Sequence, residues 1–327
     1  MRKMRRALAL LLALGLVWGY AGAEDEEDFQ DIVEVIELPE AEGGKMAELT
    51  VEEDPMIGPH EENYIYREGY SYPANNVEAP SGYADPSITV NVGWGRYLGT
   101  RYVYARVKIA QANQLRTELA SAITSEKTVK GMTLAKRVNA VIAINGDYAA
   151  KQANGTVIRQ GETLRLRSKG NADVLVIDTE GNFHILPSAT TEQIEAYVDA
   201  VNVFTFGPGL VIDGVGVHDD KRIGAIGSHK GAQRVAICQT GELEYLLITA
   251  EGPEDEGSKG LTIDQFVTLI ESFGDVQQAY NLDGGSCSTL VFRKNDNYWS
   301  KYNGPLNSKN RTLKDIIYFA DAWIPKN

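Results

Sequence analysis

VQQAYNLDGGSCST, residues 276–289, is an apolar segment that ends abruptly in polar residues and glycine. A second stretch, AVIAINGDY at residues 140–148, has the same design. Where buried strands end in this way, polar groups collect at one rim of a sheet, and ligands often bind there. Asn-Gly and Asp-Gly are also the commonest turn dipeptides, so either stretch alone could be a plain turn. Together the two stretches predict a ligand site at the rim of a sheet.

The segments around these stretches alternate between helix and strand patterns. Helices are predicted at residues 113–123 and 133–138, from Thr190 to about Val198, and from Thr262 to Phe273. Strands are predicted at residues 102–109 and 140–144, with hairpins at 174–186 and 234–249. This mixture predicts an α+β fold, with mixed β-sheets flanked by helices in a single domain.

The N-terminal 62 residues differ in charge from the rest of the chain. Residues 1–23 hold four basic side chains, no acid, an apolar run and the small-residue site Ala21-Gly22-Ala23, which is the pattern of a signal peptide. Residues 24–62 hold 16 acids and one base, and without a sustained apolar period they are expected to form a disordered leader. Short apolar patches in this leader could instead dock on the domain.

The rest of the chain divides into a lead-in rich in Tyr, Gly and Pro at residues 63–96 and a domain at residues 97–327. The formal net charge of the whole chain is −13, but residues 63–327 carry only −2. An acidic to neutral chain argues against a nucleic-acid partner, and no later segment is long and apolar enough to span a membrane. We therefore expect a secreted or cell-envelope protein, with its oligomeric state left open.

Several motifs, taken in order, resemble those of the phosphodiester glycosidase family. They are AINGDY at 143–148, GPGL at 207–210, QRVA at 233–236, KGLT at 259–262 and NLDGGSCSTL at 281–290. The similarity runs from about Tyr97 to Ala322, and Asn303, Pro305 and Arg311 fit the C-terminal motif of the family. It implies a hydrolase that removes a sugar such as N-acetylglucosamine from a glycosyl-1-phosphodiester.

This chemistry needs particular groups. Cleavage at the anomeric carbon forms an oxocarbenium-like transition state and expels a phosphate monoester, so carboxylates belong beside the sugar and cations or N–H groups on the phosphate. The candidate catalytic carboxylates are Asp283, Glu251 and Asp147, and the division of acid, base and nucleophile among them stays open. The candidate groups for substrate and phosphate are Arg234, Arg311, Asn145, Gly146, Asn281, Gly284, Gly285, Ser286 and Thr289.

Several candidates also have a purely structural interpretation. Arg234 could form a surface ion pair, Asp283 could cap its own turn, and Asp147, which stands where relatives often have glycine, could only tie down a loop. Asn145 and Asn281 could bind sugar hydroxyls or close their own turns. The family pattern is also broken after Glu251-Gly252, where proline replaces a common arginine.

The cofactor and the cysteines stay open. The carboxylates could hold a divalent cation, although the sequence has no calcium-hand loop. Cys238 and Cys287 could form a disulfide in an exported protein or remain two buried thiols. A nucleophilic Cys287 would need a histidine partner, and no signature supports one.

Three functions fit the sequence. The leading one is a secreted hydrolase acting on a sugar phosphodiester, such as a cell-wall or exopolysaccharide glycopolymer. The second is a non-catalytic domain that binds a carbohydrate or a sugar phosphate. The third is a glycosidase without phosphate specificity, in which Arg234 and Arg311 could be changed with little loss of rate.

Overall fold

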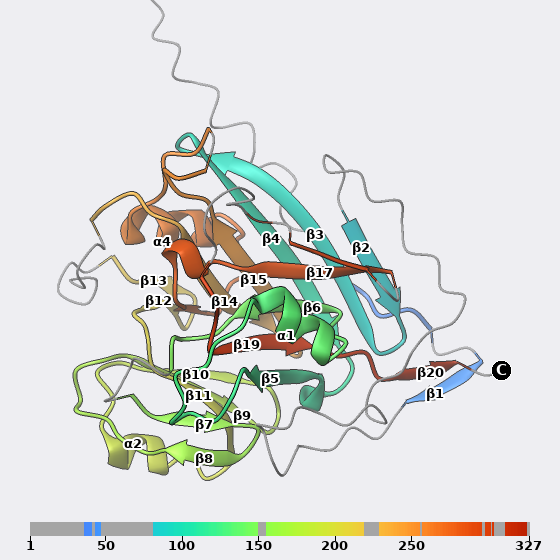
Figure 1. Ribbon diagram of the computed structural model, residues 1–327, viewed down its shortest axis with the longest axis horizontal. Helices are drawn as coiled ribbons and strands as arrows, with labels where there is room; N and C mark the ends of the chain where they lie inside the picture. The colour runs from blue at the N-terminus through green and yellow to red at the C-terminus, as the bar shows by residue number, and fades with distance from the viewer. Residues whose placement is uncertain are drawn as a thin grey trace, which may run out of the picture.

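Antiparallel β-sheets make up most of the structure (Figure 1). The computed structural model describes residues 36–40, 43–46, 81–149, 155–218, 229–255, 257–295, 298–301, 303 and 311–325. These residues form three large sheets, called sheets I, II and III, and a two-stranded ribbon. Every pairing of neighbouring strands in them is antiparallel.

The sheets combine strands that are distant in sequence. Sheet I consists, in spatial order, of β13 (Val215–Gly216), β12 (Gly209–Ile212), β16 (Gln278–Asn281), β14 (Arg234–Gly241), β15 (Glu244–Ala250), β4 (Thr100–Ile109), β3 (Ile88–Tyr97) and β2 (Ser81–Asp85). Sheet II consists of β18 (Tyr298–Lys301), β17 (Leu290–Asn295), β6 (Ile142–Asn145), β19 (Asp315–Phe319) and β5 (Leu115–Leu119). Sheet III consists of β10 (Phe183–Leu186), β9 (Val174–Asp178), β11 (Ala200–Phe204), β7 (Val157–Arg159) and β8 (Glu162–Arg165). The ribbon pairs β1 (Gly44–Met46) with β20 (Trp323–Pro325).

Three short α-helices occur in the described part of the chain, and each packs on the outer face of one sheet. They are α1 (Gly131–Arg137) on sheet II, α2 (Thr191–Glu195) on sheet III and α4 (Ile263–Glu271) on sheet I. Two 3-10 turns, η3 (Ala112–Gln114) and η4 (Gly285–Cys287), precede β5 and β17. The predicted capping boxes at the start of α2 and α4 are confirmed.

The predicted α+β class with mixed, helix-flanked sheets is wrong. The sheets are purely antiparallel, and the helices are too few and too short to form a layer. The helix expected at residues 113–123 is instead η3 and strand β5. The spacing of Leu115 and Leu119 misled the prediction, because residues four apart lie on the same face of a strand as well as of a helix. Pairing with the distant strand β19 then decides the outcome.

Side chains of the long strands alternate between a central core and an outer one. In β15, Tyr245 and Leu247 join a core that all three sheets share, whereas Leu246, Ile248 and Ala250 pack toward α4. Strands β6, β9, β14 and β19 divide their side chains in the same way. Since a slip of one residue would exchange the two cores, this alternation fixes the register of each strand.

Most of the predicted strands are confirmed as β4, β6, the β9–β10 hairpin and the β14–β15 hairpin, and the helix at residues 133–138 is α1. Strands β2 and β3 place residues 81–85 and 88–96 of the expected lead-in within sheet I. Within the expected leader, Ile36 is buried and β1 pairs with β20. The expected signal peptide lies outside the described residues.

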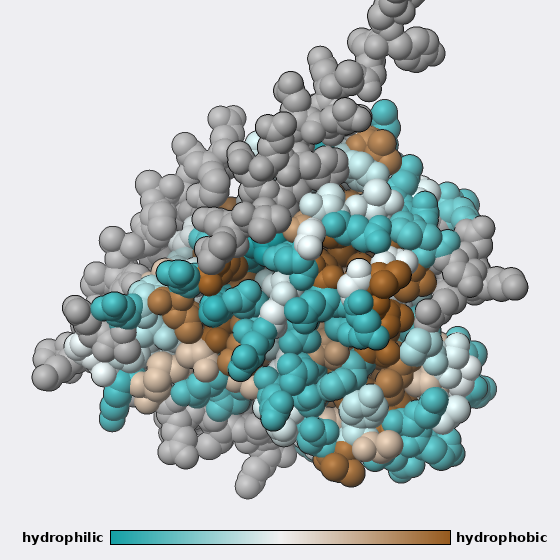
Figure 2. All heavy atoms as spheres, turned by 180° about the vertical axis from the view of Figure 1, so that it is seen from behind, coloured by the Kyte–Doolittle hydropathy of each residue, from teal (hydrophilic) through white to brown (hydrophobic). Residues whose placement is uncertain are grey.

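The described surface is mixed in character. Seen from behind, hydrophilic side chains surround separate hydrophobic patches (Figure 2). The large exposed hydrophobic residues are scattered along the chain: Trp94, Leu98, Leu166, Val198 and Val215. Over the described ranges, no helix has the length and apolar character needed to cross a membrane.

The Tyr280 hydroxyl connects sheet I with sheet III. It accepts a hydrogen bond from the Phe206 N–H (2.9 Å) and donates one to the Asp173 carbonyl (2.7 Å). We predict that Tyr280→Phe lowers the free energy of unfolding by about 1–3 kcal/mol, because both backbone groups lose this partner. Urea denaturation provides the measurement. The control is Tyr197→Phe, a half-buried ring that lies against His184 at a tilt, with an expected change within about 0.5 kcal/mol. Equal losses in the two variants would contradict the prediction.

Candidate functional site

The two polar stretches meet where the chain crosses from sheet I to sheet II. Strand β16 ends at Asn281, and the loop at residues 282–289 leads through η4 into β17. Asn145, at the end of β6, holds both ends of this loop: its Nδ2 donates to the Asp283 carbonyl (2.7 Å), and its Oδ1 accepts from the Thr289 N–H (3.0 Å). The Asn145 amide therefore closes the two turns on each other, and it is buried.

Arg311 and Asp283 form the open part of this junction. Arg311 Nη2 lies 3.1 Å from Asp283 Oδ2, and the guanidinium also donates to Cys287 Sγ from Nε (3.1 Å) and Nη2 (2.8 Å). The same guanidinium lies 5.0 Å from the centre of the Tyr148 ring. Because 48% of the Arg311 side chain is exposed, its fork can reach an anion arriving from solvent.

Burial sets the protonation of this cluster. It raises the pKa of Asp283, an effect that Cys287 and Arg311 oppose and the Asp147 charge reinforces. Burial and the Asp283 charge raise the pKa of the Cys287 thiol to about 12. The thiol therefore stays protonated near neutral pH, which makes it a poor nucleophile. Cys238 and Cys287 are both buried free thiols, without a disulfide between them.

The glycine loop is anchored by backbone contacts. A Cβ atom at Gly284 would lie 2.5 Å from the Gln233 carbonyl oxygen, and that carbonyl accepts the Gly285 N–H (3.1 Å). The Ser286 carbonyl accepts the Arg311 N–H (3.0 Å). Glycine is therefore needed for close approach to β14, and the Gly285 N–H is already bonded within the protein.

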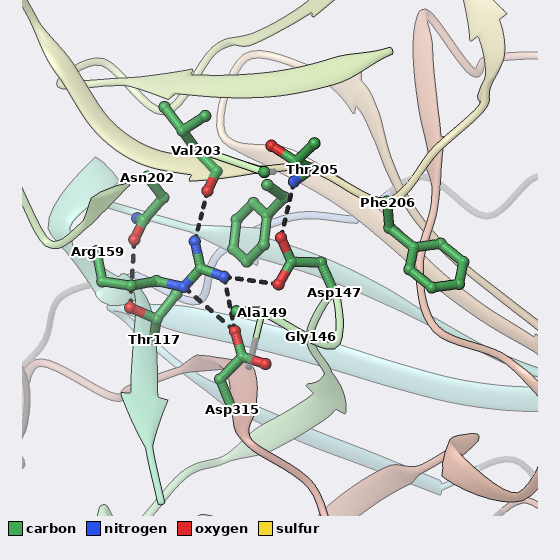
Figure 3. Close-up of polar contacts among 12 residues, drawn as sticks. Thr117, Gly146, Asp147, Ala149, Arg159, Asn202, Val203, Thr205, Phe206 and Asp315 are labelled. Carbon is green, nitrogen blue, oxygen red and sulfur yellow. Dashed lines mark hydrogen bonds and ion pairs between the residues drawn. The ribbon is translucent and has the colours of Figure 1, made fainter. Parts of the chain in front are cut away.

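Asp147 lies on the buried side of the junction. Arg159, with a fully buried side chain, places Nη2 2.9 Å from Asp147 Oδ1 and 2.7 Å from Asp315 Oδ2 (Figure 3). Asp147 Oδ2 accepts the Thr205 N–H (2.7 Å), so both of its oxygens are bonded. The Arg159 guanidinium also stacks 4.1 Å from the centre of the Phe204 ring. This arrangement fits a positioning role for Asp147.

The two carboxylates share one cation. Burial, reinforced by Asp147 and opposed by Arg159, raises the pKa of Asp315 to about 6. Gly146 lies against the same carboxyl, since a Cβ there would be 2.2 Å from Asp315 Oδ1. The cluster thereby fixes the turn that places the Tyr148 ring beside the Arg311 guanidinium.

Glu251, Arg234 and Asn281 also have partners inside the protein. Glu251 is buried, where Oε1 pairs with Arg101 (2.5 Å) and Oε2 accepts the Ser258 hydroxyl (3.0 Å). Arg234 donates to the Leu261 and Lys230 carbonyls, each at 2.9 Å, and burial lowers its pKa to about 10. Asn281 Nδ2 donates to the Gly207 carbonyl (2.7 Å). These contacts fix loops around the junction.

Two cavities adjoin Arg311 and Asp283. A small one, about 10 Å³, is lined by Asp283, Cys287, Tyr148 and Asp315 together with four neighbours. A larger one, about 330 Å³, is lined in part by Arg311 and Thr289. Only the larger cavity is in the size range of small-molecule sites.

Sequence reasoning missed Arg159, Asp315 and Tyr148. The first two interrupt or open apolar runs, TVIRQG at 156–161 and KDIIYF at 314–319, and a lone charge in a buried strand indicates a buried ion pair. In the described part of the chain, no group of three or more His, Cys, Asp or Glu side chains is arranged to hold a metal ion.

Comparison with known proteins identifies the family of the chain. A family model of phosphodiester glycosidases matches residues 138–320, more than half of the chain. The chain belongs to the phosphodiester glycosidase family. Membership indicates a hydrolase of the phosphodiester glycosidase type. No curated protein sequence matches the chain.

Among the solved structures that resemble the chain, two illustrate the shared fold. One is the catalytic domain of zebrafish N-acetylglucosamine-1-phosphodiester alpha-N-acetylglucosaminidase, auto-inhibited by its pro-peptide, at 16% identity and a TM-score of 0.58. The match covers 72% of this chain and 84% of the zebrafish one. The other is a hypothetical protein from Synechocystis, at 14% identity and a TM-score of 0.56, covering 73% of this chain and 63% of that one.

We predict that Arg159→Met lowers the free energy of unfolding by about 3–5 kcal/mol, because it leaves two buried carboxyls without their cation. Arg96→Met is the control. The Arg96 side chain is exposed and bonds the Gly257 carbonyl (3.0 Å), so its loss should cost less than about 1 kcal/mol. Chemical denaturation of both variants is the measurement, and similar losses would refute a buried cluster.

The raised pKa of Asp315 predicts how stability changes with pH. The folded state retains this proton up to about pH 6, so the associated stability is fully present below about pH 4 and is lost as the pH rises through 6. Asp315→Asn removes this titration. The free energy of unfolding of the parent, relative to the variant, should therefore decrease between about pH 4 and about pH 7. Parallel pH profiles of the two proteins in urea denaturation would contradict this.

Proposed function

We propose that this chain is an exported hydrolase that releases a sugar of the N-acetylglucosamine type from a glycosyl-1-phosphodiester, with a cell-envelope glycopolymer as substrate class. The pairing of Asp283 with Arg311 carries this proposal. A half-exposed guanidinium there stands beside a carboxyl that burial keeps protonated to higher pH than usual. The guanidinium suits a phosphate, and the protonated carboxyl suits the oxygen that leaves with it.

In the proposed reaction, the bond between the anomeric carbon and the phosphate oxygen breaks. Asp283 donates its proton to that oxygen, water adds its hydroxyl to the anomeric carbon, and the proton lost by water restores Asp283 through solvent. Arg311 holds the phosphate as negative charge develops on it. The products are a free sugar and a phosphate monoester.

The other predicted site residues have supporting roles in this proposal. Asn145 and Thr289 hold the Asp283 loop, and Asp147 holds the turn below it. Glu251, predicted as catalytic, is paired with Arg101, and we assign it to positioning of the loop that carries Ser258. The catalytic domain spans residues 97–327 in this proposal, and export rests on the signal-peptide pattern of residues 1–23.

The direct test is incubation with UDP-N-acetylglucosamine or a teichoic-type glycosyl phosphodiester, followed by detection of free sugar. We expect Asp283→Asn to lower kcat by about 10²-fold or more, and Arg311→Met to lower kcat/KM by about tenfold or more. Asp199→Asn, at an exposed position, is the matched control and should keep full activity.

Each alternative predicts a different result. Release of sugar phosphate would identify a phosphodiesterase that cleaves the other side of phosphorus. Ligand binding without turnover in the parent protein would identify a non-catalytic binding domain. Full activity of Arg311→Met would identify a glycosidase without phosphate specificity.

The proposed acid role of Asp283 also predicts the shape of the pH profile. Only the protonated carboxyl can donate, so kcat/KM should decrease as the pH rises through the raised pKa of Asp283. Residual activity of Asp283→Asn should lack this decrease. A profile of the parent that stays flat or rises over the same range would rule out this acid.

A further inference from the structure

A cavity of about 330 Å³ opens beside Arg311, between α1 and the β17–β18 side of sheet II. Its cationic lining residues are Lys130, Lys136, Lys301 and Arg311. The remaining lining residues are Gly131, Met132, Thr133, Thr289 and Val291. None of these nine described residues is acidic. We call this cavity the basic pocket.

The charged side chains that line the basic pocket are all cationic. Burial lowers the pKa of Lys301 to about 8; Glu251 and Asp255 oppose this effect, and the charge of Lys130 reinforces it. Lys301 therefore remains largely protonated at neutral pH, and its ammonium group can donate to an anion. An anion in the pocket would be attracted by the four cationic side chains that line it.

The basic pocket is continuous with the candidate site. The Arg311 guanidinium that bonds Asp283 Oδ2 also lines the pocket, and so does Thr289, whose N–H bonds Asn145. A phosphate held by Arg311 would therefore sit at the mouth of the pocket. Whatever is attached to the far side of that phosphate then points toward the three lysines.

The lining favours an anionic group over a neutral sugar. Sugar sites commonly combine a flat aromatic surface with amide and carboxylate groups, and the lining described here has none of these. Ammonium groups instead favour phosphate oxygens, by charge-assisted hydrogen bonds. The volume is sufficient for a second phosphate with a short linker.

We infer that the basic pocket binds a second phosphate, carried by the leaving group of the substrate. The preferred substrates are then glycosyl phosphodiesters with a further phosphate on the side away from the sugar, as in a nucleoside diphosphate sugar or a chain of phosphodiester-linked units. This inference rests on the proposed function, because it assumes that Arg311 holds the scissile phosphodiester.

The test uses two substrates that differ by one phosphate: the 2-hydroxyethyl diester of N-acetylglucosamine 1-phosphate and its 2-phosphoethyl counterpart, each in both anomers. At low salt we expect kcat/KM of the parent to be about tenfold or more higher for the phosphorylated diester. This ratio should fall by about tenfold in Lys301→Ala and in the double variant Lys130→Ala, Lys136→Ala. Lys127→Ala is the control, since Lys127 is exposed on the same segment and does not line the pocket.

Calorimetry with inorganic pyrophosphate measures anion binding to the pocket independently of catalysis. We expect binding to the parent and to Lys127→Ala, and at least about fivefold weaker binding to Lys301→Ala. If neither diester is cleaved but pyrophosphate binds in this lysine-dependent way, phosphate binding by the pocket is supported and the proposed function is wrong. Equal cleavage of the two diesters, unaffected by the lysine variants, overturns the inference and leaves the proposed function standing. Absence of pyrophosphate binding also overturns it.

Discussion

The central strands of the three sheets bury both of their faces, and the rest of the structure depends on this constraint. One face of each sheet joins the shared central core, and the other is covered by a short helix. Strand ends from different sheets are thereby brought together at the edge of the core. The loop from β16 to β17 crosses from sheet I to sheet II at such a place, with the end of β6 beside it.

The same constraint explains why the junction has a buried side and an open side. On the buried side, Arg159 lies between Asp147 and Asp315. The opposite charges of these side chains stabilise one another where water cannot. On the open side, Arg311 and Asp283 meet solvent. The buried cluster holds the turn of Tyr148, whose ring faces Arg311. The core thereby helps to fix the position of a side chain that would contact a substrate.

The sequence indicated the location of the candidate site better than the fold around it. Asn145 and Asp283 were predictable because each follows an apolar run that ends in glycine and polar residues. The fold class was not, since the pairing of β5 with β19 joins segments about 200 residues apart and no local pattern reports it. The partners of Arg159 and Arg234 depend on the same long-range contacts. Residue type alone gave Arg234 a plausible but undecided role, and it gave Arg159 none.

In the proposed reaction, Asp283 and Arg311 promote cleavage of the bond between the anomeric carbon and the phosphate oxygen, and water adds to that carbon. Hydrolysis in water labelled with ¹⁸O, followed promptly by mass spectrometry of both products, shows which bond is cleaved. We expect one label in the released sugar and none in the phosphate monoester, because the bond between carbon and oxygen is the one that breaks. Label in the phosphate product would show cleavage at phosphorus and contradict the proposed reaction.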